Sequence, residues 1–177
     1  MPTIGEGKIR FGRSYVWLNP TINGENSGAG TWRLTNDDIA SGTDSSDLVK
    51  TAVVAPGVTI GKDQLIYITT NGQAALADAS AIATARVAGI AVTSANAGAF
   101  VSYTRNQAVS ITNVSTVVDN ASGGQLETGK YYWLSATTPG NLTRTPDTTT
   151  AGAVLVQVGL ATSANEMQIE VQTPVVI

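Results

Sequence analysis

The chain has 177 residues and a formal net charge of −3, and charged residues make up 13% of it, about half of the usual quarter. Histidine and cysteine are both absent, which excludes Ser-His-Asp triads, disulfides and thiolate zinc sites. The ten basic residues are scattered among thirteen acidic ones, so we expect no nucleic-acid partner; no apolar run approaches the ~20 residues that span a bilayer, so we expect no membrane partner either.

The first segment predicts a β-hairpin. Apolar and aromatic residues alternate in residues 14–20 ("SYVWLNP") and 30–34 ("GTWRL"), as they do in half-buried strands. The Gly/Asn-rich stretch between them, residues 21–30, has the composition of a loop. Two tryptophans in so short a hairpin suggest a local apolar anchor.

A polar connector is expected after the hairpin, over residues 35–50 ("TNDDIASGTDSSDLVK"). Thr35 or Asn36 can cap one helical turn through Ile39, with acidic residues placed favourably at its start. We therefore assign residues 1–50 to an N-terminal arm, hairpin and connector.

An internal repeat organises the rest of the chain. "GKDQLIYITTNG" begins at Gly61 and "GKYYWLSATTPG" begins at Gly129, and each run ends on a glycine 11 positions later. "GIAVTSAN" then begins at Gly89 and "GLATSAN" at Gly159. We expect the two copies to superpose with Gly61 on Gly129 and Gly89 on Gly159.

Each copy has the pattern of a small β module. A strand is predicted at "LIYI" in the first copy and at "YYWL" in the second, because the two runs are made up mainly of aromatic and β-branched residues. A turn follows at "TTNG" or "TTPG". Next comes a buried strand with a glycine, where the backbone bulges or passes close to a neighbour. The modules are predicted at residues 51–112 and 113–177. Whether they form one barrel or two domains is left open.

Two segments between these strands are less regular. Residues 106–124 predict two more alternating strands and a turn at Asn120 to Gly124, whereas the Ala-rich residues 75–89 are compatible with a short helix. Elsewhere Thr, Val and Gly favour strands and turns. The predicted fold class is mainly β: duplicated small β-barrel or β-sandwich modules with an N-terminal β-hairpin arm.

Carboxylate chemistry is the main enzymatic option that the composition leaves, through a glycosidase pair or an aspartic dyad. The candidates are Asp37, Asp38, Asp44, Asp47 and Asp63. No flanking motif recommends any pair, so we interpret them as loop and cap residues that are exposed to water.

Two further patterns fall short of a ligand site. "DSSD" lacks the alternating oxygen ligands and the distal Glu of a calcium loop, and "GENSGAG" lacks the Lys-Ser/Thr of a P-loop. We expect no cofactor, no metal and no enzymatic activity.

An aromatic run stands in the second copy. In a strand Tyr131 and Trp133 share one face and Tyr132 takes the other. Such residues form either a carbohydrate-binding platform or a core or subunit interface, and the second arrangement is the commoner.

The repeated Gly-Lys, Gly-Ile/Leu-Ala and Thr-Ser-Ala-Asn pattern resembles the small β-rich decoration, or cement, proteins that coat the heads of tailed bacteriophages. More loosely it is similar to repeat units of phage head-fibre and tail-associated proteins. The segment "YVWLNP…GTWRL" is also similar to structural proteins of phages, among them phages of cyanobacteria. The repeat covers about two thirds of the chain.

The resemblance implies a compact β-barrel or β-tulip fold, an oligomer that is often a trimer, and the major capsid protein as partner. The expected function is then that of a virion structural protein on the capsid surface, assembled in the host cytoplasm, which stabilises the phage head. The alternative is a receptor- or glycan-binding module of a head fibre or tail component. No catalytic residues come with the resemblance.

The N-terminal segment is the expected docking element. A basic, glycine-opened arm precedes the aromatic hairpin, and an arm of this kind can add a strand to a neighbour's sheet edge while aromatics anchor it. An arginine in the second strand can offer a planar donor fork to a carboxylate. The partner-binding candidates are Lys8, Arg10, Arg13, Trp17, Trp32 and Arg33.

Overall fold

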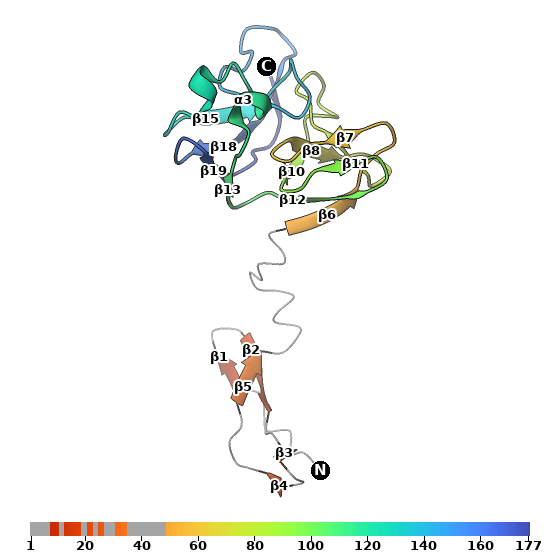
Figure 1. The fold of residues 1–177 in the computed structure, drawn as a ribbon, viewed down its shortest axis with the longest axis vertical. Coiled ribbons are helices and arrows are strands. Elements are labelled where there is room, and N and C mark those ends of the chain that lie inside the picture. The colour runs from red at the N-terminus through yellow and green to blue at the C-terminus, as the bar shows by residue number, and fades with distance from the viewer. Residues whose placement is uncertain (1–7, 11–12, 19–20, 23–24, 27–30, 35–48) are drawn as a thin grey trace. The chain divides into compact units, whose positions relative to one another are not determined.

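The computed structural model describes residues 8–10, 13–18, 21–22, 25–26, 31–34 and 49–177 (Figure 1). The chain divides into two compact units, Met1–Asp47 and Leu48–Ile177. The division falls close to the expected end of the N-terminal segment at residue 50.

The first unit is built from short antiparallel strands. They are β1 (Lys8–Arg10), β2 (Arg13–Leu18), β3 (Thr21–Ile22), β4 (Glu25–Asn26) and β5 (Thr31–Leu34). Strands β2 and β5 form the predicted hairpin, with Trp17 opposite Trp32, and β1 extends the sheet to the order β1-β2-β5. The helical turn expected in the connector lies outside the described residues.

The second unit carries most of the chain. Its strands are β6 (Val49–Val53), β7 (Thr59–Ile60), β8 (Leu65–Ile68), β9 (Ala74–Leu76), β10 (Val87–Ala91), β11 (Ala95–Asn96), β12 (Phe100–Thr104), β13 (Ala108–Ser110), β14 (Val118–Asp119), β15 (Tyr131–Leu134), β16 (Leu142–Thr143), β17 (Val154–Leu155), β18 (Gln157–Ala161), β19 (Glu166–Ile169) and β20 (Val175–Val176). Its helical turns are α3 (Val114–Val117) and η1 (Ser122–Gly124). The mainly β fold class is confirmed.

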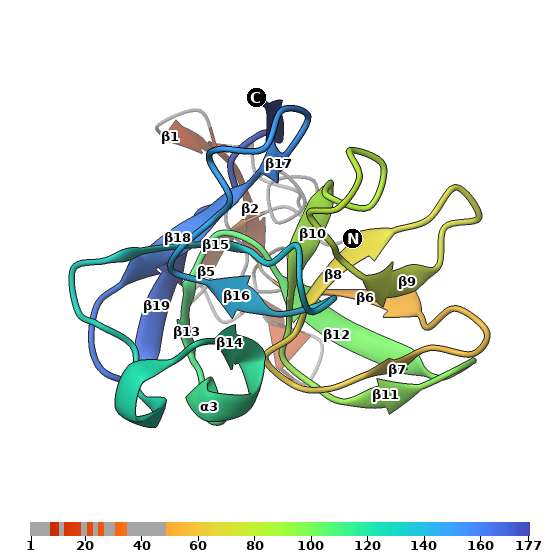
Figure 2. The same ribbon diagram turned by 90° about the horizontal axis from the view of Figure 1, so that it is seen from above.

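Two sheets form the body of this unit (Figure 2). The first has the order β6-β12-β10-β8-β9 and the second the order β13-β19-β18-β15-β16-β14. The first five strands of each order are antiparallel and match one another in turn, from β6 with β13 to β9 with β16. The sixth strand of the second sheet, β14, pairs in parallel with β16. Its counterpart in the first sheet is a parallel bridge between Val54 and Ala74. The repeat in the sequence is therefore a repeat of strand pairing. We call β6 to β12 the first module and β13 to β20 the second.

Gly89 and Gly159 occupy equivalent positions, as predicted. Gly89 lies opposite Ile66 and Gly159 lies opposite Tyr132, and in both sheets a one-residue irregularity comes directly before the glycine. A Cβ at either position would lie 2.3 Å from a carbonyl oxygen of the adjoining strand. The close backbone approach explains why both positions are glycine.

Gly61 and Gly129 are not equivalent, which corrects the expected superposition. The residue that matches Gly129 is Asp63: both have positive φ, 71° and 79°, and each donates its N–H over 2.8 Å to the carbonyl oxygen of an alanine, Ala91 or Ala161. The shift is two residues. A two-residue slip leaves every side chain of a strand on its original face, so the hydrophobic pattern cannot reveal it.

The boundary between the modules also differs from the prediction. Strand β13 was expected in the first module, which was predicted to end at residue 112, but it pairs with β19 in the second sheet. By strand pairing the modules meet between Thr104 and Ala108. They are nevertheless parts of one compact unit.

Two expected local structures are replaced by others. Residues 75–89 form strand β9, turns and the start of β10 rather than a helix. One reason is that Ala74–Leu76 pairs with β8. The other is that the Thr84 hydroxyl donates to the carbonyl oxygens of Asp78 and Ala81 and so holds a turn. The second strand expected in residues 106–124 becomes the single turn α3 followed by the short β14. The turn expected at Asn120 to Gly124 is present, with positive φ at Asn120.

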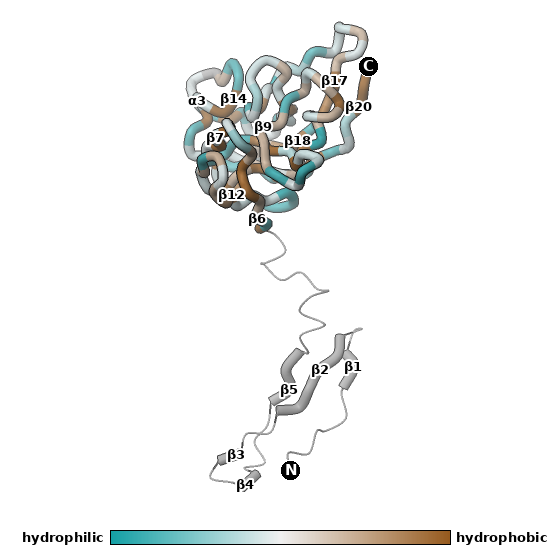
Figure 3. The backbone as a smooth tube through the Cα atoms, turned by 90° about the vertical axis from the view of Figure 1, so that its right-hand side faces the viewer, coloured by the Kyte–Doolittle hydropathy of each residue, from teal (hydrophilic) through white to brown (hydrophobic). Residues whose placement is uncertain are grey.

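Two clusters of buried residues make the core, and the apolar strands around them are brown in Figure 3. The smaller cluster lies within the first module and consists of Val54, Ile60, Ile66, Ala74, Ala91 and Val101. The larger cluster combines most of the buried residues of the second module with six from the first: Leu65, Ala77, Ala79, Ala85, Val87 and Ile90. The first sheet is thus covered on both faces, and the second module supplies one of the two covers.

Changing Gly89 or Gly159 to alanine tests the close approach. We expect Gly89→Ala and Gly159→Ala each to lower the free energy of unfolding by roughly 2–3 kcal/mol, since the carbonyl oxygen in the way belongs to a strand backbone. Gly61→Ala is the matched control, because its nearest atoms belong to the movable Gln64 side chain, and it should cost less than about 1 kcal/mol. Urea unfolding followed by circular dichroism measures the three values, and equal losses would contradict the register described here.

Candidate functional site

The strand pairing of the first unit brings most of the predicted docking residues together. Lys8 lies opposite Tyr15, Arg10 opposite Arg13 and Trp17 opposite Trp32. Paired and alternate residues of a strand fall on one face of a sheet. By this alternation, five of the six candidates share a face: Lys8, Arg10, Arg13, Trp17 and Trp32.

Arg33, the sixth candidate, is opposite Val16 and belongs to the other face. The structure also corrects the expectation of a free N-terminal arm. Lys8–Arg10 already pairs with β2 of the same chain, so it is not a free arm, and strand addition to a partner would use the edges at β1 and β5. Residues 1–7 lie outside the described residues.

A polar junction ties the two modules of the second unit together. The backbone N–H and the hydroxyl of Thr112 each donate to Oδ2 of Asp63 over 2.8 Å. Asp63 is fully buried, and its Oδ1 is buried without a hydrogen-bond partner. The expectation that Asp63 is a solvated loop residue is therefore wrong: its carboxylate links the modules. Asp37, Asp38, Asp44 and Asp47 lie outside the described residues.

An open cavity with a volume of about 600 Å³ lies beside the 135–154 loops of the second module. Small polar groups dominate its lining, which includes residues 135–138, 143, 145, 147 and 150 together with Asp119 and Asn120. Ser135 and Asn141 donate to the two carboxylate oxygens of Asp119. This network fixes one wall of the cavity. Its members come from separate segments, and no sequence motif predicted it.

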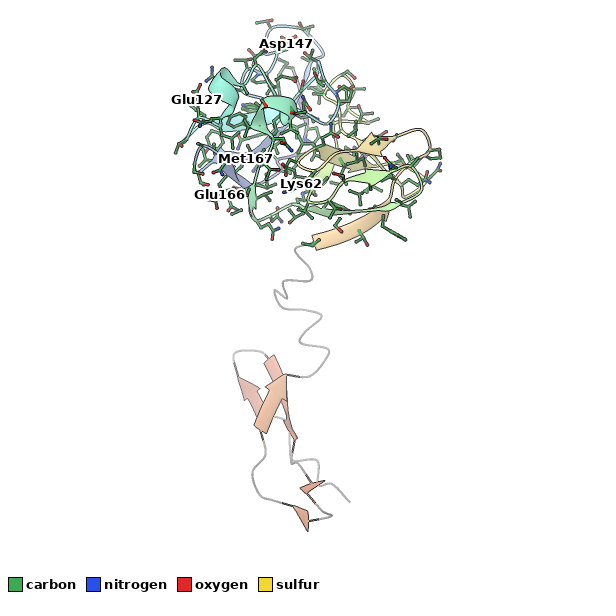
Figure 4. All side chains as sticks on the ribbon, in the orientation of Figure 1. Lys62, Glu127, Asp147, Glu166 and Met167 are labelled. Carbon is green, nitrogen blue, oxygen red and sulfur yellow. The ribbon has the colours of Figure 1, made fainter. Side chains whose placement is uncertain are left out.

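Asp147 orders the rim of this cavity. Its Oδ1 accepts hydrogen bonds from the backbone N–H groups of Thr149 and Thr150, and bonds from Thr150 and Thr149 hold the pKa of the exposed carboxyl well below its usual range. The carboxylate therefore stays charged at neutral pH and stabilises the turn at residues 147–150. Figure 4 shows Asp147 at the periphery, well apart from Lys62.

The aromatic run divides as expected. Tyr132 is buried in the larger core cluster, and its hydroxyl accepts the N–H of Glu127 over 2.9 Å; burial raises the pKa of that hydroxyl. Tyr131 is 52% exposed and Trp133 is half-buried. The outward face of the second sheet thus carries two aromatic residues.

Within the described ranges, no group of three or more acidic residues is placed to hold a metal ion. None of the helices described is long and apolar enough to cross a membrane. The chain matches no protein-family model and no curated protein.

Replacing Asp63 tests the junction between the modules. Asp63→Gly removes both bonds to Thr112 while easing the positive φ, and we expect it to lower the free energy of unfolding by about 1 kcal/mol. Asp63→Ala removes the same bonds and keeps the unfavourable backbone conformation, so it should cost about 1 kcal/mol more.

Thr112→Ser, which keeps both donors, is the control and should change stability by less than about 0.5 kcal/mol. Chemical denaturation of the full chain measures the series. Equal stability of Asp63→Gly and the unchanged protein would contradict the role of the carboxylate as a link.

Proposed function

We propose that the protein is a non-enzymatic structural protein of a phage virion, a decoration or cement protein that binds the major capsid protein and stabilises the head. Residues 1–47 supply the docking element, and the second unit forms the body of the protein. The protein acts as a homo-oligomer, a trimer by the resemblance noted above. It is located on the capsid surface after assembly in the host cytoplasm.

The observation that carries the proposal is the composition of one face of the first unit's sheet. Three cationic and two tryptophan positions fall on it, in a unit separate from the duplicated body. Arg10 and Arg13 are directly opposite each other, and like charges so placed destabilise a strand pair. An acidic surface of a partner offsets this repulsion, while tryptophan and arginine are the residues that most often anchor protein interfaces.

The body of the protein supports the same function. Its low charge and small polar side chains suit a surface that lies against other proteins. Copies held at many capsid sites need little affinity each, because multivalent attachment multiplies weak contacts.

The docking face is tested on particles that lack the protein. We expect Arg10→Glu combined with Arg13→Glu, and separately Trp17→Ala, to lower occupancy of such particles at least about tenfold, since each change removes anchors from one face. Deletion of residues 1–13 should have the same effect. Occupancy is measured by quantitative gel analysis of purified particles and by electron microscopy.

Lys50→Glu is the matched control, because Lys50 is an exposed cation of β6 in the second unit. It should leave occupancy unchanged. Full occupancy by folded variants of the docking face would overturn the proposed role of this face.

A second candidate function is that of a receptor- or glycan-binding module of a head fibre or tail. The cavity of about 600 Å³ with its serine and threonine lining favours it, since hydroxyl and carboxylate groups at a concave site bind sugar hydroxyls. A glycan array probed with the full chain separates the two functions. So does fractionation, because a decoration protein stays with the heads when tails are removed.

A further inference from the structure

The two sheets carry a pair of equivalent surfaces, of which one is buried and the other is exposed. Leu65 and Ile90 on the first sheet are fully buried. Tyr131 and Leu160 occupy the matching positions of the second sheet. There, the Tyr131 side chain is 52% exposed and Leu160 is half-buried. The match follows from the registers: Ile90 is opposite Leu65 as Leu160 is opposite Tyr131. We call the surface of Tyr131, Trp133 and Leu160 the open face.

The second module covers this surface on the first sheet. Leu65 and Ile90 belong to the core cluster dominated by the second module. The turn between β15 and β16 also bonds directly to the first module: Leu65 N–H donates to the Gly140 carbonyl over 2.7 Å, and Gly140 N–H donates to the Ala77 carbonyl over 2.7 Å. The contact between the modules therefore shows how a surface of this composition is covered by a neighbouring module.

The element that docks in this example has an uncovered counterpart in the first module. Leu134, which leads into the docking turn, is 2% exposed, while Ile68 at the matching position is 37% exposed. Gly140 is buried, and a Cβ there would lie 2.8 Å from Leu76. Gly72, its counterpart, is exposed with nothing within 4 Å. We call Ile68 and residues 69–73 the free turn.

We propose that the free turn of one copy docks on the open face of a second copy of this chain. Each chain then carries one donor surface and one acceptor surface, and both are related by the internal repeat to a contact already made within the chain. Such a head-to-tail contact is heterologous and forms a closed ring when its rotation closes. A second copy is the occupant because the same chain holds the matching element.

The intermolecular contact is not a full copy of the internal one. The free turn is two residues shorter than the turn between β15 and β16, and Gly72 N–H already donates to the Thr69 carbonyl over 2.9 Å. The contact therefore depends on Ile68 packing against the aromatic residues and on the close approach that a glycine permits. Burial of such apolar surface drives most protein association.

This inference specifies the homo-oligomer of the proposed function but does not require capsid binding. The test therefore uses the isolated full chain and sedimentation velocity over a range of concentrations. Tyr131→Glu places a charge on the open face. Gly72→Asn adds a side chain to the free turn at a positive φ that asparagine tolerates.

We expect the unchanged protein to self-associate and each variant to weaken self-association at least about tenfold, giving monomers. An equimolar mixture of the two variants should form a heterodimer and nothing larger, because one intact free turn then meets one intact open face. Phe100→Glu, the same change at a 71% exposed aromatic residue of the first sheet, is the control and should associate like the unchanged protein.

Circular dichroism and thermal unfolding verify that the variants fold, and Tyr131→Ala replaces Tyr131→Glu if the charged variant does not. A monomeric unchanged protein, a variant that keeps the original mass, or a mixture that stays monomeric would each overturn the proposal. If the unchanged protein is monomeric and Tyr131→Glu abolishes particle binding, the open face belongs to the capsid contact instead.

Discussion

Coverage of the first sheet from both sides is the constraint on which the second unit depends. One face packs on residues of its own module, including Val54, Ile60 and Val101. The other face presents Leu65 and Ile90, each worth about 1.5–3 kcal/mol when fully buried, and residues of the second module cover it. The first module thus lacks one half of its core without the second, which explains why the two repeats form a single compact unit.

This arrangement makes the two repeats unequal in surface although they are alike in pairing. Tandem units that stack in one direction always leave one uncovered donor end and one uncovered acceptor end. Here the ends are the free turn and the open face. The chain as a whole has few charged residues, which favours contacts made by packing and shape over long-range electrostatics. The first unit differs in kind, because its sheet gathers cationic and aromatic positions on one face.

The predictability of the fold varies from element to element for physical reasons. The hairpin of β2 and β5 and the equivalence of Gly89 with Gly159 were predicted, because alternation and a glycine at a close approach are local signals. The match of Gly61 with Gly129 failed because a two-residue shift keeps the faces unchanged. The Ala-rich residues 75–89 carry helix propensity, but pairing of β9 with β8 outweighs it. Of the candidate site, the basic and aromatic residues were identifiable by type, whereas the hydrogen bonds between Asp63 and Thr112 were not, since the two residues are 49 positions apart.

The amino-acid sequence by itself determined the β class, the duplication and the absence of histidine and cysteine chemistry, because composition and periodicity follow from the order of residues alone. Tertiary structure decided which strand joins which sheet, as with β13 in the second module. It also decided that Leu65 is buried while its counterpart Tyr131 is exposed. Equivalent positions in a repeat have the same local pattern, and only the contact between the modules makes their surroundings different.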